Sequence, residues 1–239
     1  MKKIILPFLS CIAILGNSYA QVRYVDEVFQ NVTTETNIEY GTNWSVVYAS
    51  LGVPYAQTGS VLSLPFPPLP VPALEFDLYQ PDTDTILERP LVIVLHTGTF
   101  APIVANGNPT GMRQDAATTA ICKSYAKRGY VVANLEYRLG WNPIGGTQAE
   151  KGASLMKAVY RAIQDTKSAV RFFKEDYENG NQWGIDTSRI ILSGQGSGGW
   201  VALGYATVDK YEEITLPKFL GVDPITGATI ALIDTTEIG

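Results

Sequence analysis

A regular alternation of apolar segments between residues 73 and 206 is the feature that most constrains how this chain can fold. The segment Leu91 to Leu95 is apolar throughout, as expected for a strand that is buried on both faces. Leu74 to Tyr79 instead alternates apolar and polar residues, which indicates a strand with one buried face. The pattern predicts two further strands, at 130–138 and 190–192, and two helices, at about 115–127 and 153–177. Strands that alternate with helices in this way predict an α/β fold, with a mostly parallel sheet covered by helices.

The first twenty residues have the pattern of a signal peptide. Lys2 and Lys3 precede an apolar run from Ile4 to Leu15, and the small residues Ser18 to Ala20 precede a predicted cleavage site. The apolar run is too short to cross a bilayer. We therefore expect a mature chain that is secreted or periplasmic and has no membrane anchor.

The rest of the chain divides at about residue 72. Residues 21–72 are expected to hold N-terminal strands and a proline-rich connector, with Ile38 to Tyr40 in an early edge strand. Five prolines between 61 and 72 exclude a central strand or a helix there. Residues 73–239 are expected to form the α/β core, in which Ala228 to Ile233 predicts one more strand.

Charge and cysteine content limit the partners of the chain. The formal net charge of the 239 residues is −5, and it becomes −7 when Lys2 and Lys3 leave with the signal peptide. An acidic chain without basic clusters is not expected to bind nucleic acid. Cys122 is the one cysteine after Ala20, so we expect no internal disulfide and no thiolate metal site. We also expect no other metal site and no cofactor. Its apolar helical surroundings predict that Cys122 is a small buried side chain.

The predicted strand at 190–192 runs into a glycine-rich segment that is typical of a sharp turn leading into a helix. A serine nucleophile can occupy such a turn in the pattern G-x-S-x-G, in which small flanking residues let the strand and the helix approach closely. If Gly194 and Gly198 are the flanking residues, the nucleophile position holds Gly196 and there is no nucleophile. In this register Ser197 is expected to cap the N-terminus of a helix that begins near Gly198.

A second register is shifted by one residue. It places Ser197 at the nucleophile position and Gly199 after it. Gln195 then occupies the flanking position, where a long side chain crowds the strand and the helix. Sterics favour the first register and chemistry favours the second, so the sequence leaves both open.

These stretches together resemble the secreted carboxylesterase and lipase branch of the α/β-hydrolase superfamily, over about residues 73–206. The residues that carry the resemblance are Leu78-Tyr79, His96-Thr97-Gly98, Glu136-Tyr137-Arg138-Leu139-Gly140, Gly184-Ile185-Asp186 and the segment from Gly194 to Gly199.

The resemblance implies acyl transfer on a small-molecule ester through a serine on the turn. Ser197 is then the candidate nucleophile. The backbone N–H groups of Thr97 and Gly98 are candidate donors to the oxyanion. A further donor would be the N–H after the nucleophile position, which belongs to Ser197 or to Gly198 according to register.

A general base is the missing part of this resemblance. His96 is the only histidine and precedes the serine, whereas the order in the superfamily is serine, acid, histidine. We therefore expect a positional role for His96, and an ion pair between Arg138 and an acid such as Glu136 or Asp165. Relatives continue beyond this length, so we interpret the chain as the N-terminal part of a hydrolase domain, truncated or impaired. The alternative is a hydrolase-like binding protein that lacks the nucleophile, with Gly196 in its position.

Overall fold

The computed structural model describes residues 22–42, 73–101, 106, 108–141, 147–214, 220–222 and 226–231. The predicted signal peptide and the proline-rich segment at 61–72 lie outside these residues. The division at residues 20 and 72 stays a prediction. Among the described helices, none has the length and apolar character needed to cross a membrane.

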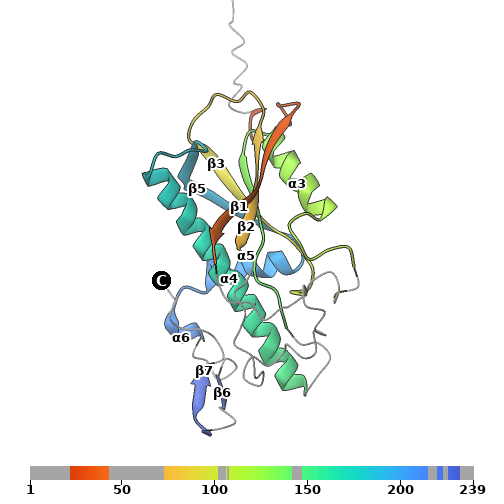
Figure 1. Ribbon diagram of the computed structural model, residues 1–239, viewed down its shortest axis with the longest axis vertical. Coiled ribbons are helices and arrows are strands. Elements are labelled where there is room, and N and C mark those ends of the chain that lie inside the picture. Colours follow the sequence, from red (N-terminus) through yellow and green to blue (C-terminus); the bar gives the residue numbers. More distant parts are fainter. Residues whose placement is uncertain are drawn as a thin grey trace, which may run out of the picture.

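The main sheet has five strands in the order β1-β2-β4-β3-β5 (Figure 1). They are β1 (Val32–Gly41), β2 (Leu74–Pro81), β3 (Arg89–Leu95), β4 (Val131–Leu135) and β5 (Ile185–Gly194). β3 pairs in parallel with both β4 and β5, while β2 pairs antiparallel with β1 and β4. The predicted α/β class is confirmed. The sheet is mixed, because its parallel half continues into an antiparallel half that ends at β1, the predicted edge strand.

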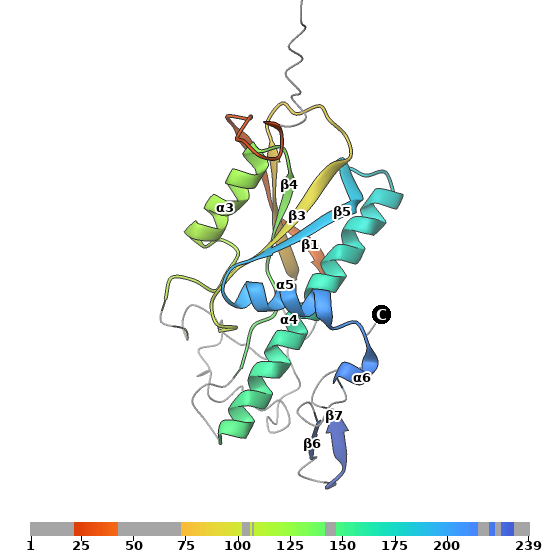
Figure 2. The same ribbon diagram turned by 180° about the vertical axis from the view of Figure 1, so that it is seen from behind.

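Helices cover both faces of this sheet (Figure 2). α3 (Ala116–Lys127) lies on one face, and α4 (Gln148–Glu178) and α5 (Ser197–Thr207) lie on the other. The two helices predicted at 115–127 and 153–177 are thus confirmed, with α4 beginning about one turn earlier. A short helix α6 (Tyr211–Ile214) follows α5.

The last strands do not join the main sheet. β6 (Leu220–Val222) and β7 (Thr229–Ala231) form a separate antiparallel pair. The strand predicted at 228–233 is therefore present as β7, although three residues long.

The α3 face of the sheet holds a small apolar cluster. Cys122 and Ala126 of α3 are fully buried against Val92 and Val94 of β3. Burial raises the pKa of the Cys122 thiol. The predicted role of Cys122 as a small buried side chain is confirmed.

The opposite face holds the larger core. Phe76 of β2 packs against Phe173 of α4 and against Trp183, with ring centroids 5.0 and 5.9 Å apart. Ile163 of α4 and Val201 of α5 belong to the same buried cluster. α4 and α5 are thereby fixed on the sheet face that borders the turn after β5.

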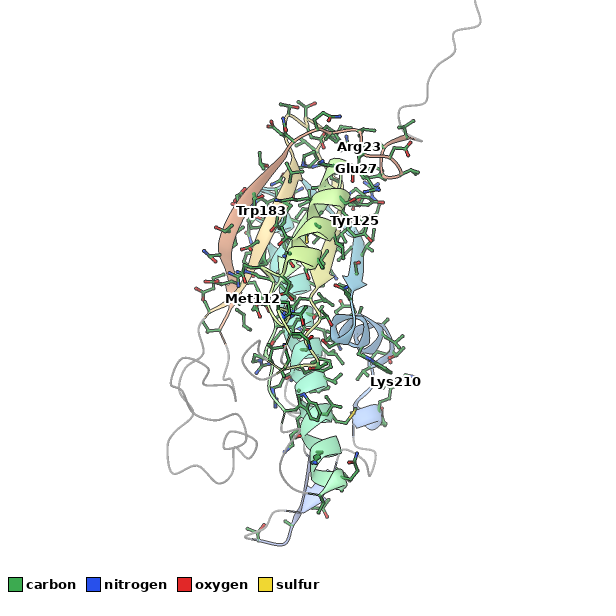
Figure 3. The ribbon with its side chains drawn as sticks, turned by 90° about the vertical axis from the view of Figure 1, so that its right-hand side faces the viewer. Arg23, Glu27, Met112, Tyr125, Trp183 and Lys210 are labelled. Carbon is green, nitrogen blue, oxygen red and sulfur yellow. The ribbon has the colours of Figure 1, made fainter. Side chains whose placement is uncertain are left out.

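The N-terminal segment packs against the C-terminal end of α3. Figure 3 shows Arg23 and Glu27 near Tyr125 of this helix. The N–H of Val28 donates to the carbonyl of Lys127 at 2.9 Å, and Glu27 forms ion pairs with Lys127 and Arg128. Arg23 also pairs with Asp84, so this segment ties α3 to the loop before β3.

Candidate functional site

The turn between β5 and α5 is built by three backbone hydrogen bonds. The N–H of Gln195 donates to the carbonyl of Leu95 at 3.2 Å, and those of Gly198 and Gly199 donate to Gln195 and Gly196 at 2.9 and 3.0 Å. Gly196 lies at the apex, with φ 55° and ψ −117°. A residue with a side chain rarely adopts this conformation, so a substitution of Gly196 would be strained, whereas the glycine is not.

Gly194 and Gly198 bring the strand and the helix into backbone contact. A Cβ atom added at Gly194 would lie 2.1 Å from the carbonyl oxygen of Gly198, and one added at Gly198 would lie 2.1 Å from that of Leu95. A Cβ atom at Gly199 would meet nothing nearer than 3.4 Å. The close approaches therefore match the register with Gly194 and Gly198 as flanking residues and Gly196 between them.

Ser197 is the first residue of α5, and its side chain is buried. Its Oγ lies 3.5 Å from the hydroxyl of Tyr137. The predicted N-cap role of Ser197 is wrong, because the helix begins one residue earlier and its cap is Gly196, which has no side chain to form a capping bond. The tight turn is completed at Gly196, which leaves Ser197 inside the helix. A nucleophilic role for Ser197 stays a prediction.

His96 is held in the protein interior beside Tyr137. The two rings stack with centroids 4.3 Å apart, and the Tyr137 hydroxyl donates to the His96 carbonyl at 2.6 Å. The His96 Nδ1 lies 2.6 Å from the Thr97 carbonyl, and its Nε2 lies 3.3 Å from Glu136 Oε1. Burial raises the pKa of Tyr137, so its hydroxyl stays protonated near neutral pH. These contacts position the loop after β3.

The first backbone donors of the loop after β3 have no acceptor among the described residues. Within the described residues, the N–H groups of Thr97, Gly98 and Ser197 have no hydrogen-bond acceptor, whereas that of Gly198 is used by Gln195. Gly98 packs tightly on Gly111, because a Cβ atom added to Gly98 would lie 2.4 Å from the Gly111 Cα. The further oxyanion donor was predicted to be the N–H of Ser197 or that of Gly198. Of these two, only the Ser197 N–H is without an acceptor among the described residues.

Hydrogen bonds from the segment after β4 hold the loop after β3 in place. Thr99 and Phe100 both have positive φ angles, of 54° and 55°. The N–H of Gly140 donates to the Phe100 carbonyl at 2.8 Å, and the Trp141 indole N–H donates to the Thr99 carbonyl at 2.7 Å. Two strained residues are thus stabilised by hydrogen bonds from the segment after β4.

Arg138 anchors that segment to α4. Its backbone N–H donates to Asp165 Oδ2 at 2.8 Å, and its guanidinium forms an ion pair with Asp165 Oδ1 at 2.8 Å. Both side chains are buried. The predicted ion pair of Arg138 is confirmed, with Asp165 as the acid.

A partly buried ion-pair cluster around Arg113 was not predicted from the sequence. Arg113 pairs with Glu75 at 2.7 Å, with Asp77 at 3.1 Å and with Glu136 at 3.7 Å. Asp77 occupies a polar position of β2, yet its side chain is buried, because Arg113 and its neighbours cover that face. Glu136 also faces His96, so the cluster supports the loop after β3. The sequence signal that could have indicated this cluster is the pair of acidic residues, Glu75 and Asp77, at alternate positions of the strand.

Comparison with known proteins places the chain in a family. The BD-FAE family model matches residues 76–222, whereas no curated protein matches the chain. Among solved structures, a bacterial heroin esterase is similar, with 20% identity, a TM-score of 0.44, and coverage of 82% of this chain and 44% of the esterase. Esterase B from Lactobacillus rhamnosis has 21% identity and a TM-score of 0.46, with coverage of 83% of this chain and 50% of the esterase.

Brefeldin A esterase, described as a bacterial homologue of human hormone sensitive lipase, has 15% identity, a TM-score of 0.45, and coverage of 89% of this chain and 40% of its own. The chain thus spans half or less of the length of these three proteins. The family assignment rests on the family model, which matches more than half of the chain. On that match, the chain belongs to the BD-FAE family of esterase-like α/β-hydrolases.

Proposed function

We propose that this protein binds a small acyl compound at the turn between β5 and α5 and does not hydrolyse it through a serine at the apex. The observation that carries the proposal is that Gly196 occupies the apex while backbone N–H groups around it have no acceptor among the described residues. Uncommitted N–H groups at such a turn can bind a carbonyl or carboxylate oxygen. A glycine offers no atom that could attack the bound carbonyl.

The binding arm of this proposal is tested with a matched pair of ligands. N-(4-nitrophenyl)butyramide keeps a carbonyl oxygen in a bond that resists hydrolysis, and butyl 4-nitrophenyl ether has a similar shape without that oxygen. Isothermal titration calorimetry should show that the amide binds at least about tenfold more tightly than the ether, a difference of about 1.4 kcal/mol. Equal binding of both ligands, or binding of neither, would overturn the proposal.

A second candidate function is ester hydrolysis through Ser197. It is favoured by the position of this serine at the first residue of α5, beside the uncommitted donors. Turnover of 4-nitrophenyl butyrate that is lost in Ser197→Ala and kept in Ser168→Ala, on α4, would support it. Among the described residues, Ser197 Oγ contacts the Tyr137 hydroxyl and no general base. A serine without such a base is a poor nucleophile near neutral pH, so we expect no turnover that depends on Ser197.

We also propose that the protein is exported. Support comes from Lys2 and Lys3, the apolar run after them and the small residues before Gln21. Expression of the full chain in a bacterium with a general secretion pathway, followed by N-terminal sequencing, should give Gln21 as the first residue. An unprocessed chain that stays in the cytoplasm would contradict this proposal.

A further inference from the structure

We infer that Thr97 closes the nucleophile position of the turn, so that Thr97 and Gly196 form one coupled pair. The threonine side chain occupies the space that the first side-chain atom of any other residue at 196 would need. This inference stands on packing and is independent of whether the protein binds an acyl compound. Thr97 is thus the residue that limits which side chains position 196 can hold.

The contact between the two positions is short. A Cβ atom added at Gly196 would lie 2.2 Å from Thr97 Oγ1 and 3.1 Å from Thr97 Cβ. Non-bonded carbon atoms normally stay about 3.5–4.0 Å apart. Rotation about χ1 of Thr97 can move Oγ1, but it leaves the Cβ atom in place. The 2.2 Å contact therefore belongs to the observed rotamer, while the tight 3.1 Å contact with Thr97 Cβ is present in every rotamer.

The Thr97 side chain is half-buried beside Gly196. Among the residues that the structure describes, Oγ1 has no hydrogen-bond partner, although the Thr97 carbonyl lies 2.6 Å from His96 Nδ1. β-Branched side chains have few accessible χ1 rotamers, so Thr97 cannot easily move aside. Oγ1 is the Thr97 atom nearest to the space that a Cβ atom at 196 would need.

This pairing has a consequence for the chemistry of the turn. A serine introduced at 196 alone would meet Thr97 and could not reach the position that the backbone offers. A glycine at 97 would remove both short contacts. A side chain at 196 is therefore expected to be tolerated better when residue 97 is changed with it.

A double-mutant cycle on folding stability tests the coupling. The four proteins are wild type, Gly196→Ala, Thr97→Gly and the double variant, each measured by urea unfolding. The strain of a positive φ at 196 is the same in both backgrounds and cancels in the cycle. We expect Gly196→Ala to reduce the equilibrium constant for folding at least tenfold more in the wild-type background than in the Thr97→Gly background. In the Thr97→Ala background the penalty should be intermediate, because an alanine keeps the Cβ atom that makes the 3.1 Å contact.

Thr99→Gly is the matched control, because Thr99 lies in the same loop and makes no close contact with a Cβ atom at 196. Its cycle with Gly196→Ala should show no coupling. If Gly196→Ala does not fold alone, folding of the double variant supports the inference. Equal penalties in the wild-type and Thr97→Gly backgrounds would overturn it, as would failure of both proteins that carry Gly196→Ala to fold.

Discussion

Single residues decide whether the loop after β3 and the turn after β5 keep their shape. Arg138 is a clear case, since it links the segment after β4 to α4 through Asp165. Burial raises the pKa of the Asp165 carboxyl, and the Arg138 guanidinium opposes that rise. The charge on Asp165 thus depends on this close cationic partner, and the loss of that partner should be costly.

We predict that Arg138→Met lowers the free energy of unfolding by about 3–5 kcal/mol, because it leaves a buried carboxylate without its partner. Urea unfolding gives this value. Arg189→Met is the control, because Arg189 and Asp186 form an exposed pair whose loss should cost less than about 1 kcal/mol. Similar losses for the two variants would show that Arg138 has no special structural role.

The thiol of Cys122 gives a second prediction at this scale. Its burial and raised pKa should make it unreactive toward Ellman's reagent near neutral pH in the native chain from Gln21 onward. In concentrated guanidinium chloride the same protein should release one equivalent of chromophore. Rapid reaction of the native protein would show that α3 does not pack on the sheet as described.

At the scale of elements, the junction of β5 and α5 depends on glycines for reasons of space. Gly194→Ala should lower the free energy of unfolding by about 3 kcal/mol, because its Cβ atom would meet the backbone of Gly198. Gly152→Ala is the control, because Gly152 lies in α4 with no atom within 4 Å of an added Cβ. That change should instead stabilise the protein by about 0.5–1 kcal/mol. Thermal or urea unfolding separates the two, and a stabilising Gly194→Ala would refute the close contact.

Periodicity in the sequence was enough to predict most elements of the fold. The apolar run at 91–95 and the helical spacing in α3 and α4 are local patterns, and each element formed where its pattern lies. The exposed position of Ile191 was not predicted, although it lies in an apolar run. Ile191 lies on β5, which is an edge strand of the described sheet. The position of β5 at the edge follows from the strand order and cannot be read from a local pattern.

The site was less predictable, because its decisive contacts join distant segments. The sequence contains both registers of the turn, and only backbone coordinates show that Gly194 and Gly198 make the close approaches. The Arg113 cluster gathers residues from β2, the end of β4 and the loop before α3, which no local pattern connects. In the same way, the contact between Thr97 and position 196 joins segments that lie far apart in the sequence.

At the scale of the whole molecule, the chain has an esterase-like α/β fold with a glycine at the apex of the turn after β5. The loop after β3 is held by Tyr137, Trp141 and the Arg113 cluster, which keeps donors near the apex. Thr97 occupies the space that a Cβ atom at position 196 would need.

The most direct test is the intact mass of the protein after incubation with a fluorophosphonate, a reagent that modifies activated serine hydroxyls. The account predicts an unchanged mass, because Gly196 has no hydroxyl and Ser197 is buried beside Tyr137, with no base in contact among the described residues. A single adduct per chain that maps to Ser197 and is absent from Ser197→Ala would contradict it, and would establish Ser197 as the nucleophile.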